Sequence, residues 1–232
     1  MINLTFSLLT SMHFEFLVED RSGYEMIEYL IPKIIGTNST NTFKIHPYKG
    51  CGSLPKGLKA NQAAEKRALF NQLPRLLKGY SLAFKNCLDD NAVIVVCDLD
   101  DKDKNTFISE LNKKRDDVLA LSGCSLNVFF CLAIEEGESW LLGDWDAIKK
   151  AYPRAKINVF RKYINDSICG TWEMLADVVY PGGSKNLKKQ GHGAEGTAKS
   201  EWAQKISPHM NVFCNKSPSF NYFKATLDRL KE

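Results

Sequence analysis

The chain has 232 residues, of which 44% are hydrophobic, 11% aromatic and 25% charged. This composition fits one α/β domain with additions, and it excludes disordered, fibrous and collagen-like proteins. The longest apolar runs, such as residues 92–97 and 128–134, fall far short of the roughly 20 residues that cross a bilayer. The sequence therefore predicts a protein that has no membrane-spanning segment and no membrane partner.

The seven cysteines are odd in number and lack C-x-x-C or zinc-ligand spacing. This pattern favours free thiols in a reducing cytoplasm. The first dozen residues have no basic region and no small-x-small cleavage site, which argues against a signal peptide. Whether translation starts at Met1 or at Met12 stays open.

Charges are unevenly distributed, although the net charge is only +4. Residues 41–90 hold nine Lys/Arg against three acids, and residues 181–232 hold nine against four. Between them lie two acidic segments, residues 98–103 and 135–146. Acidic clusters framed by basic segments favour a metal site that acts on a phosphorylated polymer, and ordinary solvated surface is the alternative.

Hydrophobic periodicity predicts alternating strands and helices along the first 150 residues. The predicted strands are residues 13–18, 42–46, 92–97 and 126–133. The predicted helices are residues 24–35 with Ser22 as N-cap, 60–79 with a kink near Pro74, 104–120, 138–150 and a closing helix after Ser217. Residues 49–57 and the Gly/Lys-rich residues 181–196 are predicted loops.

This alternation is typical of a parallel, Rossmann-like sheet with right-handed crossovers. The apolar, β-branched run 92–97 is the predicted centre of the sheet, because such runs are buried on both faces. We predict an α/β core over residues 1–150 and a mainly helical, basic extension over residues 151–232 that packs on the core.

Acidic side chains follow three of the predicted strands. Glu19 follows the first, Asp98 and Asp100 follow the third, and Glu135, Glu136 and Glu138 follow the fourth. Because the carboxyl ends of parallel strands meet at one edge of the sheet, these acids are expected to converge. In an extended segment Asp98 and Asp100 would also share one side. Clustered carboxylates need a divalent cation or raised pKa values, and oxygen ligands favour Mg²⁺ or Mn²⁺. The alternative is that these acids merely cap the following helices.

The runs FLVEDRSGYEMIEYLIPKII, VIVVCDLDD and LAIEEGESWLLGD resemble the Toprim-like proteins. Among them, the chain is most similar to a bacterial domain-of-unknown-function group related to the nuclease domain of the overcoming-lysogenization-defect (OLD) family. The Toprim pattern of one acid after the first strand and Asp-x-Asp after the third falls on Glu19, Asp98 and Asp100. The next acidic motif of that group resembles residues 138–144, which makes Glu138 the preferred further ligand.

This resemblance implies a Toprim-like fold and a Mg²⁺- or Mn²⁺-dependent nuclease, with Glu19, Asp98, Asp100 and Glu138 as catalytic and metal-binding residues. It implies an effector of bacterial defence against phages or plasmids, working with a separate ABC/AAA-type ATPase. The chain itself has no G-x-x-x-x-G-K-[ST] motif. Candidate contacts to DNA or RNA are Arg21, Lys185, Lys188 and Lys189. The sequence leaves the oligomeric state open, and a homo-oligomer is one of the alternatives.

The sequence departs from the Toprim pattern at one position, because Asp20 rather than Gly follows Glu19. The last metal ligand is therefore left open among Glu25, Glu135, Glu136, Glu138 and Asp144.

Three other functions are alternatives to the nuclease hypothesis. A haloacid-dehalogenase-like phosphatase would use Asp98 as its nucleophile, although Lys102 stands where Thr or Val is usual. A sugar-nucleotide glycosyltransferase would use Asp-x-Asp to hold a metal. A non-catalytic Toprim-like subunit would bind only an ATPase partner or nucleic acid.

Overall fold

The computed structural model describes residues 11–37, 39–55, 68–87, 90–191 and 193–231. Its centre is a four-stranded parallel sheet in the order β2-β1-β3-β4. The strands are β1 (Met12–Val18), β2 (Thr42–Pro47), β3 (Asp90–Asp98) and β4 (Asn127–Ala133). All four predicted strands are thus confirmed, and so is the α/β, Rossmann-like class with a helical C-terminal part.

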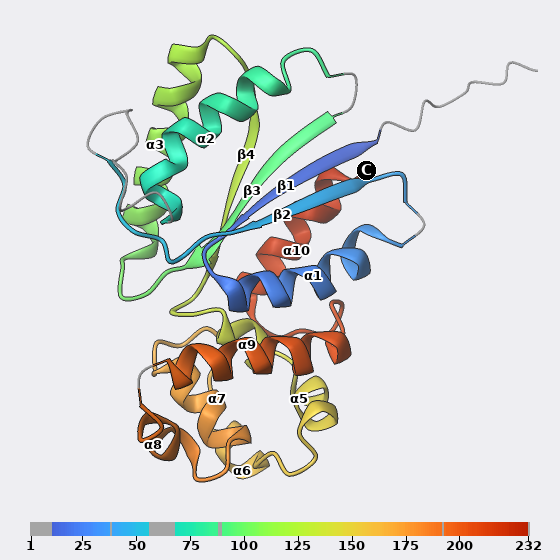
Figure 1. The fold of residues 1–232 in the computed structure, drawn as a ribbon. Helices are drawn as coiled ribbons and strands as arrows, with labels where there is room; N and C mark the ends of the chain where they lie inside the picture. Colours follow the sequence, from blue (N-terminus) through green and yellow to red (C-terminus); the bar gives the residue numbers. More distant parts are fainter. Residues whose placement is uncertain (1–10, 38, 56–67, 88–89, 192, 232) are drawn as a thin grey trace, which may run out of the picture.

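Helices cover both faces of the sheet (Figure 1). Helices α1 (Arg21–Ile35) and α10 (Pro218–Leu230) lie on one face, and α2 (Leu69–Ala83) and α3 (Lys104–Ser122) lie on the other. Successive side chains of a strand point to opposite faces. Phe16 therefore packs with α1 and α10, whereas Leu17 packs with α2 and α3.

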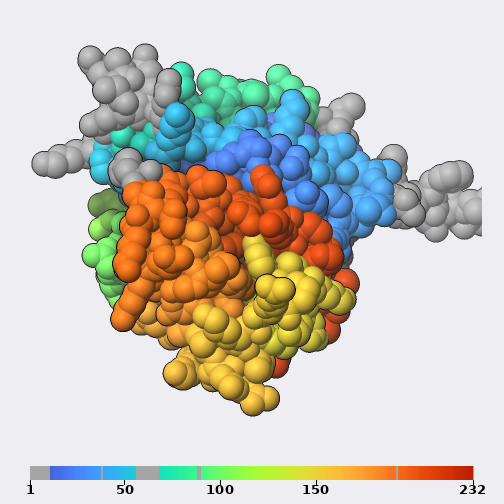
Figure 2. Space-filling model, turned by 60° about the horizontal axis from the view of Figure 1, so that its bottom comes forward, coloured from blue at the N-terminus to red at the C-terminus, as the bar shows by residue number. Residues whose placement is uncertain are grey.

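The remaining helices form a layer at the carboxyl edge of the strands (Figure 1). They are α4 (Glu138–Leu142), α5 (Trp145–Ala151), α6 (Ile157–Phe160), α7 (Thr171–Val179), α8 (Gly183–Lys188), α9 (Ala194–Ile206) and the 3₁₀ turn η2 (Ser207–His209). Helix α9 packs along α1. Figure 2 views the molecule from the side of this layer.

Helix α10 returns from the helical layer and completes the core of the sheet. Ser217 caps it by accepting a hydrogen bond from the Phe220 N–H, as its sequence predicts. The fully buried Phe223 stacks on Trp140 with 5.0 Å between ring centroids and meets Phe16 edge-on at 6.3 Å. The last helix therefore shares one hydrophobic core with the first strand.

Two helices differ from the prediction at their ends. The N-cap of α1 is Asp20, whose carboxylate accepts from the Gly23 N–H at 2.8 Å, rather than Ser22. Ser22 donates to that same carboxylate. Helix α2 begins at Leu69 and continues through Pro74 to Ala83, and residues 60–67 of the prediction lie outside the described residues.

The helix predicted over residues 138–150 is divided into α4 and α5. A Cβ atom added at Gly143 would lie 2.0 Å from Asn215 Oδ1, so the segment 215–217 presses directly on the chain there. Asp144 then starts α5 by accepting from the Ala147 N–H at 3.0 Å. The break therefore lies where a distant segment packs against the chain, and periodicity does not report such a contact.

The predicted loop over residues 181–196 contains α8 and the first turn of α9. Gly182 and Gly183 have positive φ values of 81° and 70°, and Asp177 accepts from the Ser184 N–H at 2.7 Å. Leu187 is buried. A local cap and one buried side chain thus order a segment whose composition favours a loop.

Among the described residues, no helix combines the length and the apolar character that crossing a membrane requires.

Candidate metal and active site

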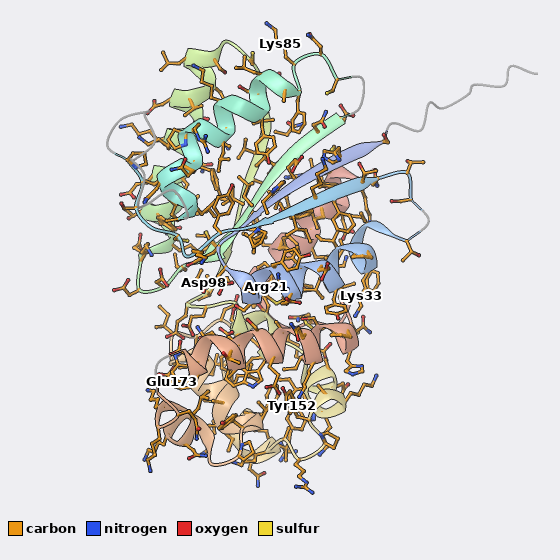
Figure 3. The ribbon with its side chains drawn as sticks, viewed as in Figure 1. Arg21, Lys33, Lys85, Asp98, Tyr152 and Glu173 are labelled. Carbon is orange, nitrogen blue, oxygen red and sulfur yellow. The ribbon has the colours of Figure 1, made fainter. Side chains whose placement is uncertain are left out.

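Three of the predicted carboxylates lie at the carboxyl ends of neighbouring strands. Glu19 directly follows β1, and its N–H donates to the Val96 carbonyl of β3 at 3.1 Å. Asp98 is the last residue of β3, and Glu138 begins α4 just after β4. A Cβ atom at Gly137 would lie 3.8 Å from Asp98 Oδ1, so the start of α4 lies against Asp98. Figure 3 shows Asp98 between the sheet and the helical layer.

Glu19 is held in place by three donors. Its Oε2 accepts from the Asp98 N–H at 2.9 Å and from the Cys51 thiol at 2.8 Å. Its Oε1 accepts from the Cys51 N–H at 3.1 Å. These contacts tie the first strand end to β3 and to the loop after β2, so the carboxylate is oriented by the fold itself.

Asp98 is the electrostatic centre of the cluster. Burial raises its pKa well above the ordinary value, and the negative charges of Glu19, Glu138 and Asp20 raise the pKa further. Lys199 opposes this effect without cancelling it. Carboxylates that repel one another in this way are stabilised by a proton or by a bound cation.

Glu138 is 3% exposed. Burial raises its pKa to about 7, and the charges of Glu136 and Asp20 act in the same direction against the Lys199 ammonium group. A carboxyl group with this pKa is half protonated at neutral pH. Such a shift is typical of functional carboxylates, although structural networks produce it as well.

Lys199 of α9 supplies the positive charge of the cluster. Its Nζ lies 2.8 Å from Glu136, 3.5 Å from Glu195 and 3.7 Å from Glu138, and its side chain is 13% exposed. Burial lowers its pKa, but the surrounding carboxylates outweigh burial and raise it. Sequence reasoning missed Lys199, since the only local signal is an ordinary Glu195–Lys199 helical pair.

Asp100 does not share the extended geometry predicted for the Asp-x-Asp pair. The strand ends at Asp98, and Asp100 takes a positive φ of 52° in the following turn. Its carboxylate is half exposed and pairs with Lys102 at 2.5 Å. Asp100 instead lines a pocket together with Asp101, Glu135, Glu136, Ile168, Gly170, Trp172 and Glu173.

The other acids that the sequence left open make structural contacts, two of them within the helical layer and one within α1. Glu135 accepts from the Thr171 hydroxyl and from the N–H groups of Cys169, Gly170 and Thr171, the last three at 2.9–3.0 Å, and these bonds lower its pKa against the effect of burial. Asp144 caps α5 and accepts from the Asn211 N–H. Glu25 forms an ion pair with Arg21.

The predicted nucleic-acid contacts lie in two places. The Arg21 side chain is 66% exposed, pairs with Glu25 and stacks over Tyr24. Lys188 pairs with Glu173 at 3.0 Å and lies over the Trp172 ring, at one side of the pocket that contains Asp100. Lys185 and Lys189 are exposed on and just after α8.

The donor chemistry of Glu19, Asp98 and Glu138 fits a hard divalent cation, because the three carboxylates share one cluster in which burial and the charges of Glu19 and Glu138 raise the pKa of Asp98. The side chains are not arranged as a closed ligand set. Across the described parts of the chain, no three His, Cys, Asp or Glu residues are placed to hold a metal ion.

Fold and site together define an α/β protein with a Rossmann-like parallel sheet and a carboxylate cluster at the carboxyl edge of its strands. The chain belongs to the DUF4276 family, a domain family of unknown function, whose model matches residues 18–228. No curated protein and no solved structure shows a significant match to the chain. The family match itself carries no link to Toprim or OLD proteins, so that relationship stays a prediction.

Proposed function

We propose that this protein is a divalent-cation-dependent nuclease that hydrolyses phosphodiester bonds. The observation that carries the proposal is the convergence of Glu19, Asp98 and Glu138 at one sheet edge, where burial and the charges of the other two carboxylates raise the pKa of Asp98. Such a cluster lowers its energy by binding a cation. The resemblance of the strand-end motifs to Toprim nucleases supports the same function.

Mg²⁺ or Mn²⁺ would be held by Glu19, Asp98 and Glu138, with Asp100 as the further predicted ligand. Bound there, the ion would activate a water molecule and stabilise the leaving oxygen of the phosphodiester. Glu19 is oriented in advance by Cys51 and the Asp98 N–H. Glu138, whose pKa is about 7, is mostly ionised above neutral pH and then available as a ligand.

Lys199 and Glu136 orient the Glu138 side of the site. The ammonium group lies between Glu136 and Glu138 and lowers the pKa of Glu138 below the value that burial alone would give. Glu136 is fixed in turn by the Trp172 N–H at 3.1 Å. The helical layer thereby helps to set the ionisation of a carboxylate at the sheet edge.

The wider setting of the proposal is a cytoplasmic effector of defence against phages or plasmids, with a separate ABC/AAA-type ATPase as partner. The absence of a G-x-x-x-x-G-K-[ST] motif from the chain is consistent with a second, ATP-hydrolysing subunit. The motif resemblance supports this setting.

A non-catalytic binding subunit is the second candidate. Two observations favour it, namely the lack of a closed ligand set among the described residues and the presence of Lys199 inside the cluster. In this case Lys199 would be the permanent counter-ion of the carboxylates.

Cleavage assays with a matched pair of variants distinguish the two functions. Plasmid DNA and a structured RNA are incubated with Mg²⁺ or Mn²⁺, with and without a co-purifying ATPase. A nuclease loses cleavage in Asp98→Asn and keeps it in Asp116→Asn, which neutralises an exposed carboxylate on α3. If the wild type cleaves neither polymer under any of these conditions and Asp98→Asn still forms the same complexes, the binding-subunit function replaces the nuclease.

A further inference from the structure

One part of the helical layer carries a strong excess of positive charge, as residues 41–90 do elsewhere in the chain. Residues 149–191 contain nine Lys/Arg and three Asp/Glu, a net charge of +6, whereas the whole chain has +4 and the rest therefore −2. All nine cationic residues are exposed. We call them the basic surface, and they are Lys149, Lys150, Arg154, Lys156, Arg161, Lys162, Lys185, Lys188 and Lys189.

Each of the three acids of this segment makes a contact within the fold, and one of them offsets a cation of the basic surface. Asp166 accepts from the Ser217 hydroxyl and the Ser219 N–H, both at 2.6 Å. Asp177 accepts from the Ser184 N–H. Glu173 pairs with Lys188. None of the three is fully exposed, so all fully exposed charges of residues 149–191 are positive.

The basic surface belongs to one packed unit beside the carboxylate site. Helix α7 packs against both α6 and α8, and the Lys156 N–H donates to the Val178 carbonyl at 3.0 Å. Trp172 and Glu173 of α7 line the pocket that contains Asp100, and Lys188 lies over the Trp172 ring. Figure 2 shows the segments from α5 to α9, in yellow and orange, forming the exposed end of the molecule.

We propose that the basic surface binds the phosphate backbone of a nucleic acid and leads it to the carboxylate cluster. This inference deepens the proposed function. It rests on that function because only a nuclease activity makes nucleic acid, rather than another polyanion, the expected partner. It extends the contact region from Lys185, Lys188 and Lys189 to cationic residues on α5, in the turn between α5 and α6, and directly after α6. The chemistry recognised is a regular row of phosphodiesters, without base specificity.

Counter-ion release gives the proposal a measurable signature. Each phosphate contact adds about 0.9 to the slope of log K against log salt concentration for duplex DNA. Neutralising one contacting cation therefore lowers the slope by about 0.9. If the wild type and the variant bind equally at 1 M salt, the variant binds about tenfold more weakly at 0.1 M salt. If binding depended only on the net charge of the protein, removing the same number of cations from any part of its surface would weaken binding equally.

The test compares two variants that each lose four exposed positive charges. The first changes Arg154, Lys156, Arg161 and Lys162 to Gln, which spares Lys149 and Lys188 because both make internal contacts. The control changes Lys78, Lys85, Lys104 and Lys113 to Gln, on and near α2 and α3. Figure 3 shows Lys85 at the opposite end of the molecule from Glu173. Circular dichroism and thermal melts verify that both variants fold.

Binding of a fluorescent 30-base-pair DNA duplex, and of an RNA duplex, is measured by anisotropy in EDTA from 50 to 400 mM KCl. EDTA removes any dependence on cleavage, so failure of the nuclease reaction leaves this test intact. The first variant is expected to lower the salt slope by about 2 to 4 and to weaken binding at least tenfold at 0.1 M KCl, while the control stays within about threefold of the wild type.

Three results would overturn the proposal. The first is wild-type protein that binds neither duplex at 50 mM KCl. The second is an equal effect, or no effect, in both variants. The third is that the protein binds anionic lipid vesicles or polyglutamate and that added DNA does not displace them. This result would assign the basic surface to a different partner.

Discussion

Replacing Glu138 with glutamine should stabilise the protein at alkaline pH. The pKa of Glu138 is about 7 in the fold against an ordinary value of 4.5. An acid whose folded pKa is raised contributes stability below its unfolded pKa, and this stability is lost as the pH rises from about 4.5 through 7. At 1.36 kcal/mol per pKa unit, the full cost of the buried charge is about 3 kcal/mol. The neutral amide of Glu138→Gln does not carry this cost.

Urea unfolding in EDTA at pH 5, 6, 7 and 8 measures this difference directly. The wild type and Glu138→Gln should differ by less than about 1 kcal/mol from charge effects at pH 5, and the variant should gain about 3 kcal/mol relative to the wild type by pH 8. Glu201→Gln is the matched control, because Glu201 is half exposed and pairs with Lys205 within α9. Parallel pH profiles for the wild type and Glu138→Gln would refute the assignment of a buried, raised-pKa carboxylate at this position.

Two further outcomes are expected from the same structure. Lys199→Met leaves the Glu136 and Glu138 carboxylates without their ammonium partner, so it should destabilise the protein by about 3 to 5 kcal/mol at pH 8 in urea unfolding and by less at pH 5. A loss that does not depend on pH would contradict the pairing. Phe223→Ala removes a fully buried ring stacked on Trp140 and should cost about 3 to 5 kcal/mol. A cost below 1 kcal/mol would mean that α10 is not part of the sheet's core.

The sequence alone determined the frame of the molecule. The β-branched run 92–97, the shorter strands around it and the helices between them predicted a parallel sheet, because side-chain periodicity is a local property that the backbone geometry imposes. The convergence of Glu19 and Asp98 also followed from sequence, since parallel neighbouring strands must end at one edge. Ser217 marked the start of the last helix by a local capping rule.

The tertiary structure decided what depends on contacts between distant segments. Lys199 enters the carboxylate cluster only because α9 packs along α1, and its own sequence neighbourhood contains no sign of this. Asn215 packs closely against Gly143, where the helix predicted over 138–150 is divided into two. Asp100 turns away from the extended geometry because β3 ends at Asp98 and the next residues enter a turn tied to the Glu135 carbonyl. Pairing across long sequence separations is set by the packing of the whole core, and local patterns therefore do not encode it.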